Sequence, residues 1–117
     1  MPVVQDALEL EPGQYAVLFI SERPLDPPGY AAAMEEVMSL AEGMDGYLGF
    51  ESLRDGRDGI FVSYWRDRSA VDDWARHARH REAKMQGVAQ WYDAFRSVTC
   101  RIEDVRHFRR PPGVNPQ

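Results

Sequence analysis

The fold of this chain is decided by residues 59–108, GIFVSYWRDRSAVDDWARHARHREAKMQGVAQWYDAFRSVTCRIEDVRHF. The stretch begins with an apolar segment typical of a strand, changes to helical spacing after Ser69, and ends in an alternating segment that starts at Val98. It also carries three Trp residues and the spaced pair His77 and His80. We therefore expect this segment to supply part of a sheet, a covering helix and the pocket for any chemistry.

The first strand of this segment is predicted over residues 60–65. Period-two alternation sends Phe61, Ser63 and Trp65 to one face and the intervening residues to the other, and both faces are apolar enough to be covered. Ser69, with an acidic residue three positions later, then matches a capping box, in which a side chain binds the free amides of a first helical turn. The second main helix is predicted to begin there.

The apolar stripe of this helix consists of Val71, Trp74, Ala75 and Ala78. Gly87 interrupts the helical spacing, and the apolar residues of 88–95 then predict a third, shorter helix with an aromatic face. A closing strand is predicted from Val98 to Phe108, with a bulge at residues 103–104.

Two strands and one helix are predicted ahead of this segment. Residues 15–21, YAVLFIS, form a nearly continuous apolar run that is typical of a central strand. A helix is expected after Asp26, which has the pattern of an N-cap. Residues 47–54 predict a second strand, in which Gly49 marks a bulge or a close contact. The two Asp-Gly pairs of residues 55–59 predict a hairpin into the next strand.

The order of these elements predicts an α+β fold of the ferredoxin-like, split βαβ type, with a four-stranded antiparallel sheet and its helices on one face. Two strands are apolar on both faces, so the uncovered face is expected to pack against a second copy in a twofold homodimer. Residues 1–13 are expected to form an N-terminal arm, residues 14–109 the folded domain, and residues 110–117 a disordered tail.

Composition excludes several classes of function. The 117 residues suffice for one domain with its own core. The net charge of -5 argues against nucleic acid as a partner. Cys100 is the only cysteine, which excludes an intrachain disulfide and is consistent with a cytoplasmic location. Because no apolar run approaches the roughly 20 residues that span a bilayer, no membrane partner is expected.

Three motifs and the order of elements together resemble one known family. The motifs are the strand ending SYW at Trp65, the W..H..H spacing of Trp74, His77 and His80, and the Trp91-Tyr92 pair before the closing strand. Together they resemble the antibiotic biosynthesis monooxygenase (ABM) domain over about residues 15–108. The resemblance implies a dimeric α/β barrel and the cofactor-independent oxidation of polyketide-like phenols to quinones. A haem-degrading branch of the family uses an axial His, a strand Trp and an Asn.

The resemblance also implies site residues. It gives Trp65 as the strand Trp and His80 as the helix His, with His77 second. Either histidine can accept a phenolic proton, because unperturbed His titrates near neutral pH. The walls that bind an aromatic substrate are expected from Tyr30, Met38, Trp74, Trp91 and Tyr92. No metal site is expected, since no carboxylate completes a site with the two histidines.

Alternatives to a monooxygenase remain open. A non-catalytic protein that binds a small molecule is one of them, because the only Asn of the chain is Asn115 in the tail and no Asn lies on the predicted strands. Haem binding or degradation, with His80 as axial ligand, is another. In the plainest interpretation the aromatic and Met residues are core, and both histidines are solvated.

Overall fold

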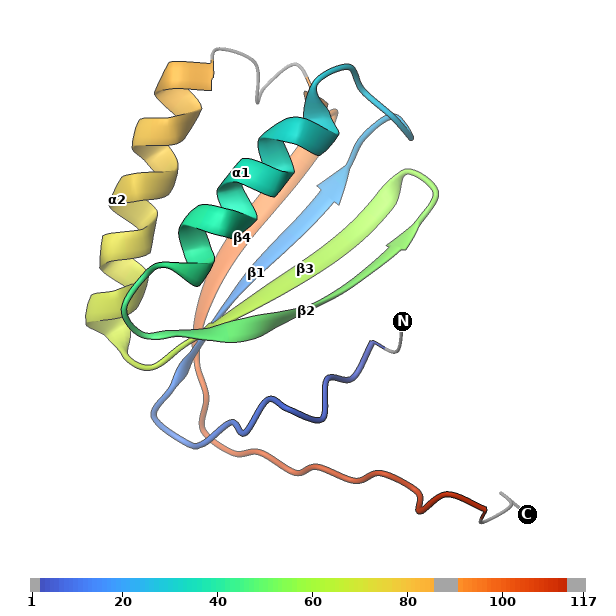
Figure 1. Ribbon diagram of the computed structural model, residues 1–117, viewed down its shortest axis with the longest axis vertical. Helices are drawn as coiled ribbons and strands as arrows, with labels where there is room; N and C mark the ends of the chain where they lie inside the picture. Colours follow the sequence, from blue (N-terminus) through green and yellow to red (C-terminus); the bar gives the residue numbers. More distant parts are fainter. Residues whose placement is uncertain (1–2, 86–90, 114–117) are drawn as a thin grey trace.

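The computed structural model describes residues 3–85 and 91–113, except for the side chains of residues 79–85. Its elements are β1 (Tyr15–Glu22), α1 (Tyr30–Glu42), β2 (Tyr47–Asp55), β3 (Asp58–Trp65), α2 (Arg68–Met85) and β4 (Ala94–Arg101). The strands form one antiparallel sheet in the order β2-β3-β1-β4, and both helices cover the same face of it (Figure 1). The predicted α+β, ferredoxin-like fold is confirmed.

Strand register places one set of alternating side chains under the helices. Phe19 of β1 lies opposite Phe61 of β3 and Ser97 of β4. At the end of β3, the fully buried Trp65 packs with Ala70 and Val71 of α2. This contact holds the start of α2 over the sheet, because the helix cannot move away without exposing the largest buried side chain of the described chain.

Both helices begin differently from the sequence prediction. α1 follows Gly29, which has φ 81° and provides no side-chain cap, so the prediction of Asp26 as N-cap was wrong. α2 begins one residue after Asp67, whose Oδ1 accepts the Ala70 N–H at 2.9 Å. A carboxylate at this position binds a free amide and favours the positive end of the helix dipole, so Asp67 replaces Ser69 as the cap.

The predicted third helix over residues 88–95 is wrong at its C-terminal end. Phe95 lies in β4, opposite Ser21 of β1. Its ring stacks on Phe19 with 5.3 Å between centroids, although 53% of Phe95 remains exposed. Residues 86–90 of the predicted helix lie outside the described residues.

β4 also ends earlier than predicted. It stops at Arg101, so the extension to Phe108 with a bulge at residues 103–104 was wrong. Its partner β1 starts only at Tyr15, after a turn in which Gly13 has φ 92°. Two further backbone hydrogen bonds of 2.8 Å, from the Gly13 N–H to the Ile102 carbonyl oxygen and from the Ile102 N–H to the Gln14 carbonyl oxygen, close the pairing at this turn.

The predicted hairpin and the irregularity at Gly49 are both confirmed. β2 and β3 are antiparallel neighbours, with a register shift between Tyr47 and Gly49. A Cβ at Gly49 would come within 2.5 Å of Leu8, so the N-terminal arm approaches the strand here. The Gln5 N–H also donates to Glu51 Oε2 at 2.9 Å. The division of the chain into arm, domain and tail stays a prediction.

Gly46, in the turn between α1 and β2, allows the start of α2 to approach closely. It has φ 88°, and a Cβ built on it would lie 2.6 Å from the Ala70 Cβ. We expect Gly46→Ala to lower the free energy of unfolding by about 2–4 kcal/mol, through left-handed backbone strain and crowding. Gly56→Ala is the matched control, because Gly56 has φ 57° and nothing within 4 Å, so only the strain of about 1–2 kcal/mol applies. Equal losses in guanidinium unfolding curves would contradict the role of the Ala70 contact.

The sheet face opposite the helices carries an exposed apolar row. Ile20, Ile60 and Leu53 are neighbours on three adjacent strands. Their exposed fractions are 40%, 49% and 60%. Contiguous apolar surface of this kind marks an interaction surface.

Within residues 3–85 and 91–113, no helix has the length and apolar character needed to cross a bilayer.

Candidate functional site

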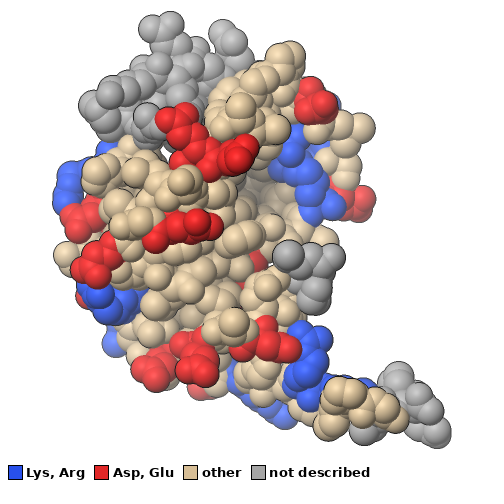
Figure 2. Space-filling view, viewed as in Figure 1, with Lys and Arg blue, Asp and Glu red and all other residues tan. Residues whose placement is uncertain are grey.

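A cavity of about 500 Å³ lies between the helices and the sheet. Alternate residues of the strands form its floor, and the inner face of α1 forms much of its roof. Figure 2 shows the surface hollowed between the helices and the β2–β3 side of the sheet, with acidic side chains beside the hollow on the helix side and basic ones on the opposite side. The volume and the mainly apolar, aromatic lining are typical of a small-molecule site.

One end of the cavity is built around Trp65. The Trp65 indole N–H donates to Ser63 Oγ at 2.9 Å, and its ring stacks on Trp74 with 5.4 Å between centroids. The Tyr47 hydroxyl at this end is buried and has no hydrogen-bond partner among the described residues. Burial, with a smaller contribution from Glu42, raises the pKa of Tyr47, so this hydroxyl stays neutral. Trp65 and the Tyr47 hydroxyl, neither of which has accessible surface, therefore close this end of the cavity.

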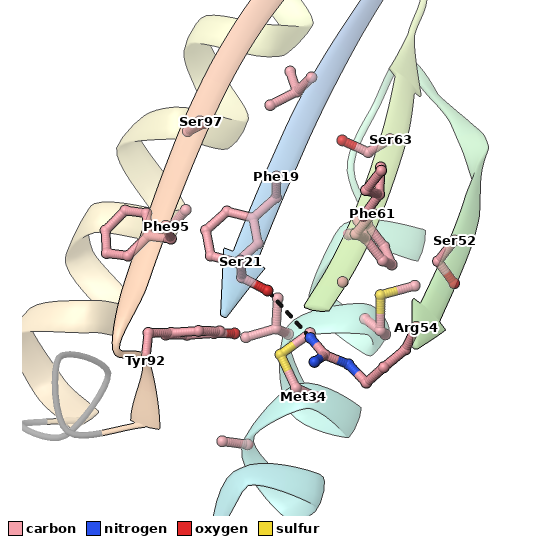
Figure 3. Close-up of a pocket in the computed structure, with 18 of the residues that line it drawn as sticks. Phe19, Ser21, Met34, Ser52, Arg54, Phe61, Ser63, Tyr92, Phe95 and Ser97 are labelled. Atoms are coloured by element: carbon pink, nitrogen blue, oxygen red, sulfur yellow. Dashed lines mark hydrogen bonds between the residues drawn. The ribbon is translucent and has the colours of Figure 1, made fainter. Parts of the chain in front are cut away.

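The opposite end of the cavity is polar. The Arg54 guanidinium donates to Ser21 Oγ at 3.1 Å, and the Tyr92 and Tyr30 hydroxyls lie 3.3 Å apart. Figure 3 shows Arg54, Ser21 and Tyr92 directed toward the same region of the cavity. Burial and the hydrogen bond to Tyr30 raise the pKa of Tyr92 well above its ordinary value, while the charges of Arg23 and Arg54 oppose that rise. Tyr92 is therefore a neutral hydroxyl beside a fixed positive charge.

All five residues predicted to bind substrate line the cavity: Tyr30, Met38, Trp74, Trp91 and Tyr92. Trp91 closes the N-terminal end of α1, since its indole N–H donates to the Pro28 carbonyl oxygen at 3.0 Å and its ring meets that of Tyr30 edge-on. Trp65 lines the cavity as well. The structure brings these residues together, and their roles toward a substrate stay predictions.

The structure shows neither of the two candidate histidines in the described cavity lining. His77 is exposed on α2 and is absent from the described cavity lining. His80 lies in α2, and its side chain falls outside the described residues. The predicted role of either histidine as a base stays a prediction. A haem would need its axial ligand from His80, because the described lining contains no histidine.

No metal centre is visible in the described part of the chain. Within these residues no group of three or more His, Cys, Asp or Glu side chains lies close enough to hold an ion. Cys100 is exposed on β4 and does not line the cavity. The chemistry that the described cavity offers therefore comes from hydroxyls, aromatic rings and one guanidinium.

Sequence reasoning missed the polar residues at both ends of the cavity: Ser21, Tyr47, Ser63 and Arg54. Strand alternation contained a signal for Arg54, because it is two residues from Ser52 and shares its face toward the helices. An Arg on the covered face of a sheet requires an explanation. The irregularity at Gly49 hid this signal, since it shifts the alternation of β2.

Comparisons with known proteins give the family. Residues 27–86 match the model of the antibiotic biosynthesis monooxygenase family. The uncharacterised protein YqjZ of Bacillus subtilis is 39% identical over 101 residues, which cover 85% of this chain and 88% of that protein.

Two solved structures share the fold. Rv0793 from Mycobacterium tuberculosis superposes with a TM-score of 0.65 at 15% identity, covering 80% of this chain and 99% of that one. SnoaB, a cofactor-independent oxygenase from Streptomyces nogalater, superposes with a TM-score of 0.64 at 9% identity, covering 80% and 96%. At these identities the likeness supports the fold, whereas the sequence matches support the family. The matched residues 27–86 make up more than half of the chain. The chain therefore belongs to the antibiotic biosynthesis monooxygenase family.

Proposed function

We propose that this protein is a cytoplasmic monooxygenase that needs no cofactor and oxidises an aromatic or polyketide-like phenol in the cavity between helices and sheet. The observation that carries the proposal is the cavity itself, whose volume is about 500 Å³ and whose walls include Trp65, Trp74, Trp91 and Tyr92. Flat polycyclic molecules fit an aromatic slot of this size. The description of SnoaB as a cofactor-independent oxygenase supports the class of reaction.

In this reaction the substrate supplies all the electrons. The ionised phenol or enol passes one electron to dioxygen, and the resulting radicals combine to a peroxide at the activated carbon. Loss of water then leaves a carbonyl, so that a CH2 group and O2 give C=O and H2O without another reductant. The protein binds and orients the anion and keeps water away from the peroxide. Trp65 is our candidate for the end wall of the site. His80 is our candidate for the base that accepts the phenolic proton.

The test is oxygen uptake with a phenolic anthrone in the absence of added flavin or metal. We expect Ala33→Trp, which places an indole at a lining position of α1, to lower kcat/KM at least about tenfold by filling the cavity. Ala32→Trp is the matched control, because Ala32 is exposed and lies outside this cavity. Ligand binding without oxygen uptake would instead support a non-catalytic binding protein.

We further propose that the protein acts as a homodimer. The exposed row of Ile20, Ile60 and Leu53 runs across three strands on the face away from the helices. A second copy related by a twofold axis would cover this row, because a twofold interface matches one surface to itself. Most of the cavity floor, including Phe61 and Ser63, lies on the other face of the sheet, while Leu53 and Ile60 of the row also border the cavity. Each copy would retain its own site, with one border of it beside the interface.

A further inference from the structure

The Arg54 side chain is held in a fixed position at the polar end of the cavity. Its Nη1 donates to the Arg57 carbonyl oxygen at 3.1 Å and to that of Gly56 at 3.4 Å, and its Nη2 donates to Ser21 Oγ at 3.1 Å. The guanidinium lies against Gly59, where a Cβ would come within 2.3 Å of Nη2. Gly59 therefore leaves the space that the guanidinium occupies.

This fixed cation has no carboxylate partner in the described part of the chain. Several exposed arginines, including Arg57, Arg66 and Arg68, pair with an aspartate. Arg54 is the only charged residue in the described cavity lining. A guanidinium group carries about five N–H donors. The three hydrogen bonds above use two donors on Nη1 and one on Nη2. The Nε–H and one Nη2–H are left for a ligand. Unpaired guanidinium donors in a mostly apolar site favour an anionic oxygen group.

A second positive charge lies behind the same end of the cavity. Arg23 is 7% exposed, its guanidinium carbon lies 4.0 Å from the centre of the Tyr30 ring, and its Nε has no partner among the described residues. Both arginines act on Tyr92, where their charges favour the ionised phenol and so work against the burial that raises its pKa. The positive potential thus reaches the oxygen atoms at this end of the cavity.

We propose that Arg54 binds an anionic oxygen of the ligand, so that the protein takes aromatic molecules that carry an ionised phenol or a carboxylate. The inference rests on the proposed function in that the ligand occupies the same cavity. It adds a direction to binding: the acidic group lies against Arg54 and Ser21, and the rings extend toward Trp74 and Trp65.

Matched probes test this proposal without requiring turnover. Calorimetry at pH 7.5 compares 2-naphthoate with the neutral 2-naphthalenemethanol, which has a similar size. We expect the carboxylate to bind roughly ten- to hundredfold more tightly, the usual range for hydrogen bonds to a charged group. A nitronaphthol tests the other anion, the ionised phenol, because its phenolate absorbs visible light and can be titrated by absorbance. We expect Arg54 to lower the apparent pKa of the bound nitronaphthol by at least about one unit.

Variants assign the preference to Arg54. Arg54→Gln is expected to remove the advantage of the carboxylate and the pKa change of the nitronaphthol, while Arg68→Gln, which removes one exposed charge outside the cavity, leaves both unchanged. Circular dichroism checks the fold. If Arg54→Gln fails to fold, Arg54→Met, which retains an apolar stem, takes its place.

The outcomes separate this inference from the proposed function. Equal binding of both naphthalene probes by the native protein would overturn the inference and leave the aromatic cavity in place. An anion preference that survives in the Arg54 variants would overturn it too. If no probe binds, the proposed function fails together with the inference.

Discussion

Replacing Trp65 by Ala is expected to lower the free energy of unfolding by about 3–5 kcal/mol, the usual cost of removing a large buried aromatic side chain. Trp65 has no exposed surface and contacts the start of α2, so the loss leaves a cavity at the junction of helix and sheet. Urea unfolding curves measure the change. Phe108→Ala is the matched control, because Phe108 is 71% exposed and its removal is expected to cost less than about 0.5 kcal/mol.

A second variant separates packing from hydrogen bonding at this site. Trp65→Phe retains most of the ring but removes the N–H that donates to Ser63. We expect it to lose about 1–2 kcal/mol, clearly less than Trp65→Ala. Similar losses in the two variants would mean that the hydrogen bond, and not the packing, fixes this end of the cavity.

Leu18→Lys is expected to convert the proposed homodimer into monomers. Leu18 lies opposite Val62 on β3 and Val98 on β4, at the centre of the sheet face that we assign to the dimer. An unpaired ammonium group buried there costs several kcal/mol. We therefore expect the dissociation constant to rise at least about a hundredfold, which corresponds to about 2.7 kcal/mol.

Sedimentation velocity at protein concentrations from about 1 to about 100 µM measures this change in the dissociation constant. Ala31→Lys on the exposed surface of α1 is the matched control and should remain dimeric. Circular dichroism checks that both variants fold. A native protein that is monomeric across the whole range would contradict the dimer, and a Leu18→Lys protein that stays dimeric would contradict the assigned face.

The sequence predicted the architecture well because its strongest signals are local. The two Asp-Gly pairs specify the β2–β3 hairpin, and the alternation of residues 60–65 gives the two faces of β3. The cap of α2 was misplaced because Asp67 and Ser69 are both good N-cap residues, and the choice depends on where β3 ends. Phe95 was misplaced because helical spacing of aromatic residues is indistinguishable from a short turn followed by a strand.

The candidate site was predicted in part. Aromatic walls such as Trp74 and Tyr92 were identifiable because their apolar spacing indicates burial on the helix side. The contact between Arg54 and Ser21 was not identifiable, because it joins residues 33 positions apart and depends on strand register and on the space left by Gly59. The order of elements indicates which face is buried, but only the register shows which side chains meet at one end of it.

The position of β1 in the sheet has a consequence for biosynthesis. Of the four strands that the structure describes, β1 leaves the ribosome before the others, yet one of its two neighbours is β4, which leaves after them. Translation adds about 5–20 residues per second, so one edge of this central strand lacks its partner for on the order of several seconds. An open apolar edge is a template for pairing with other nascent chains. Transcripts truncated before residue 94 would therefore yield products prone to aggregation and suited to capture by chaperones.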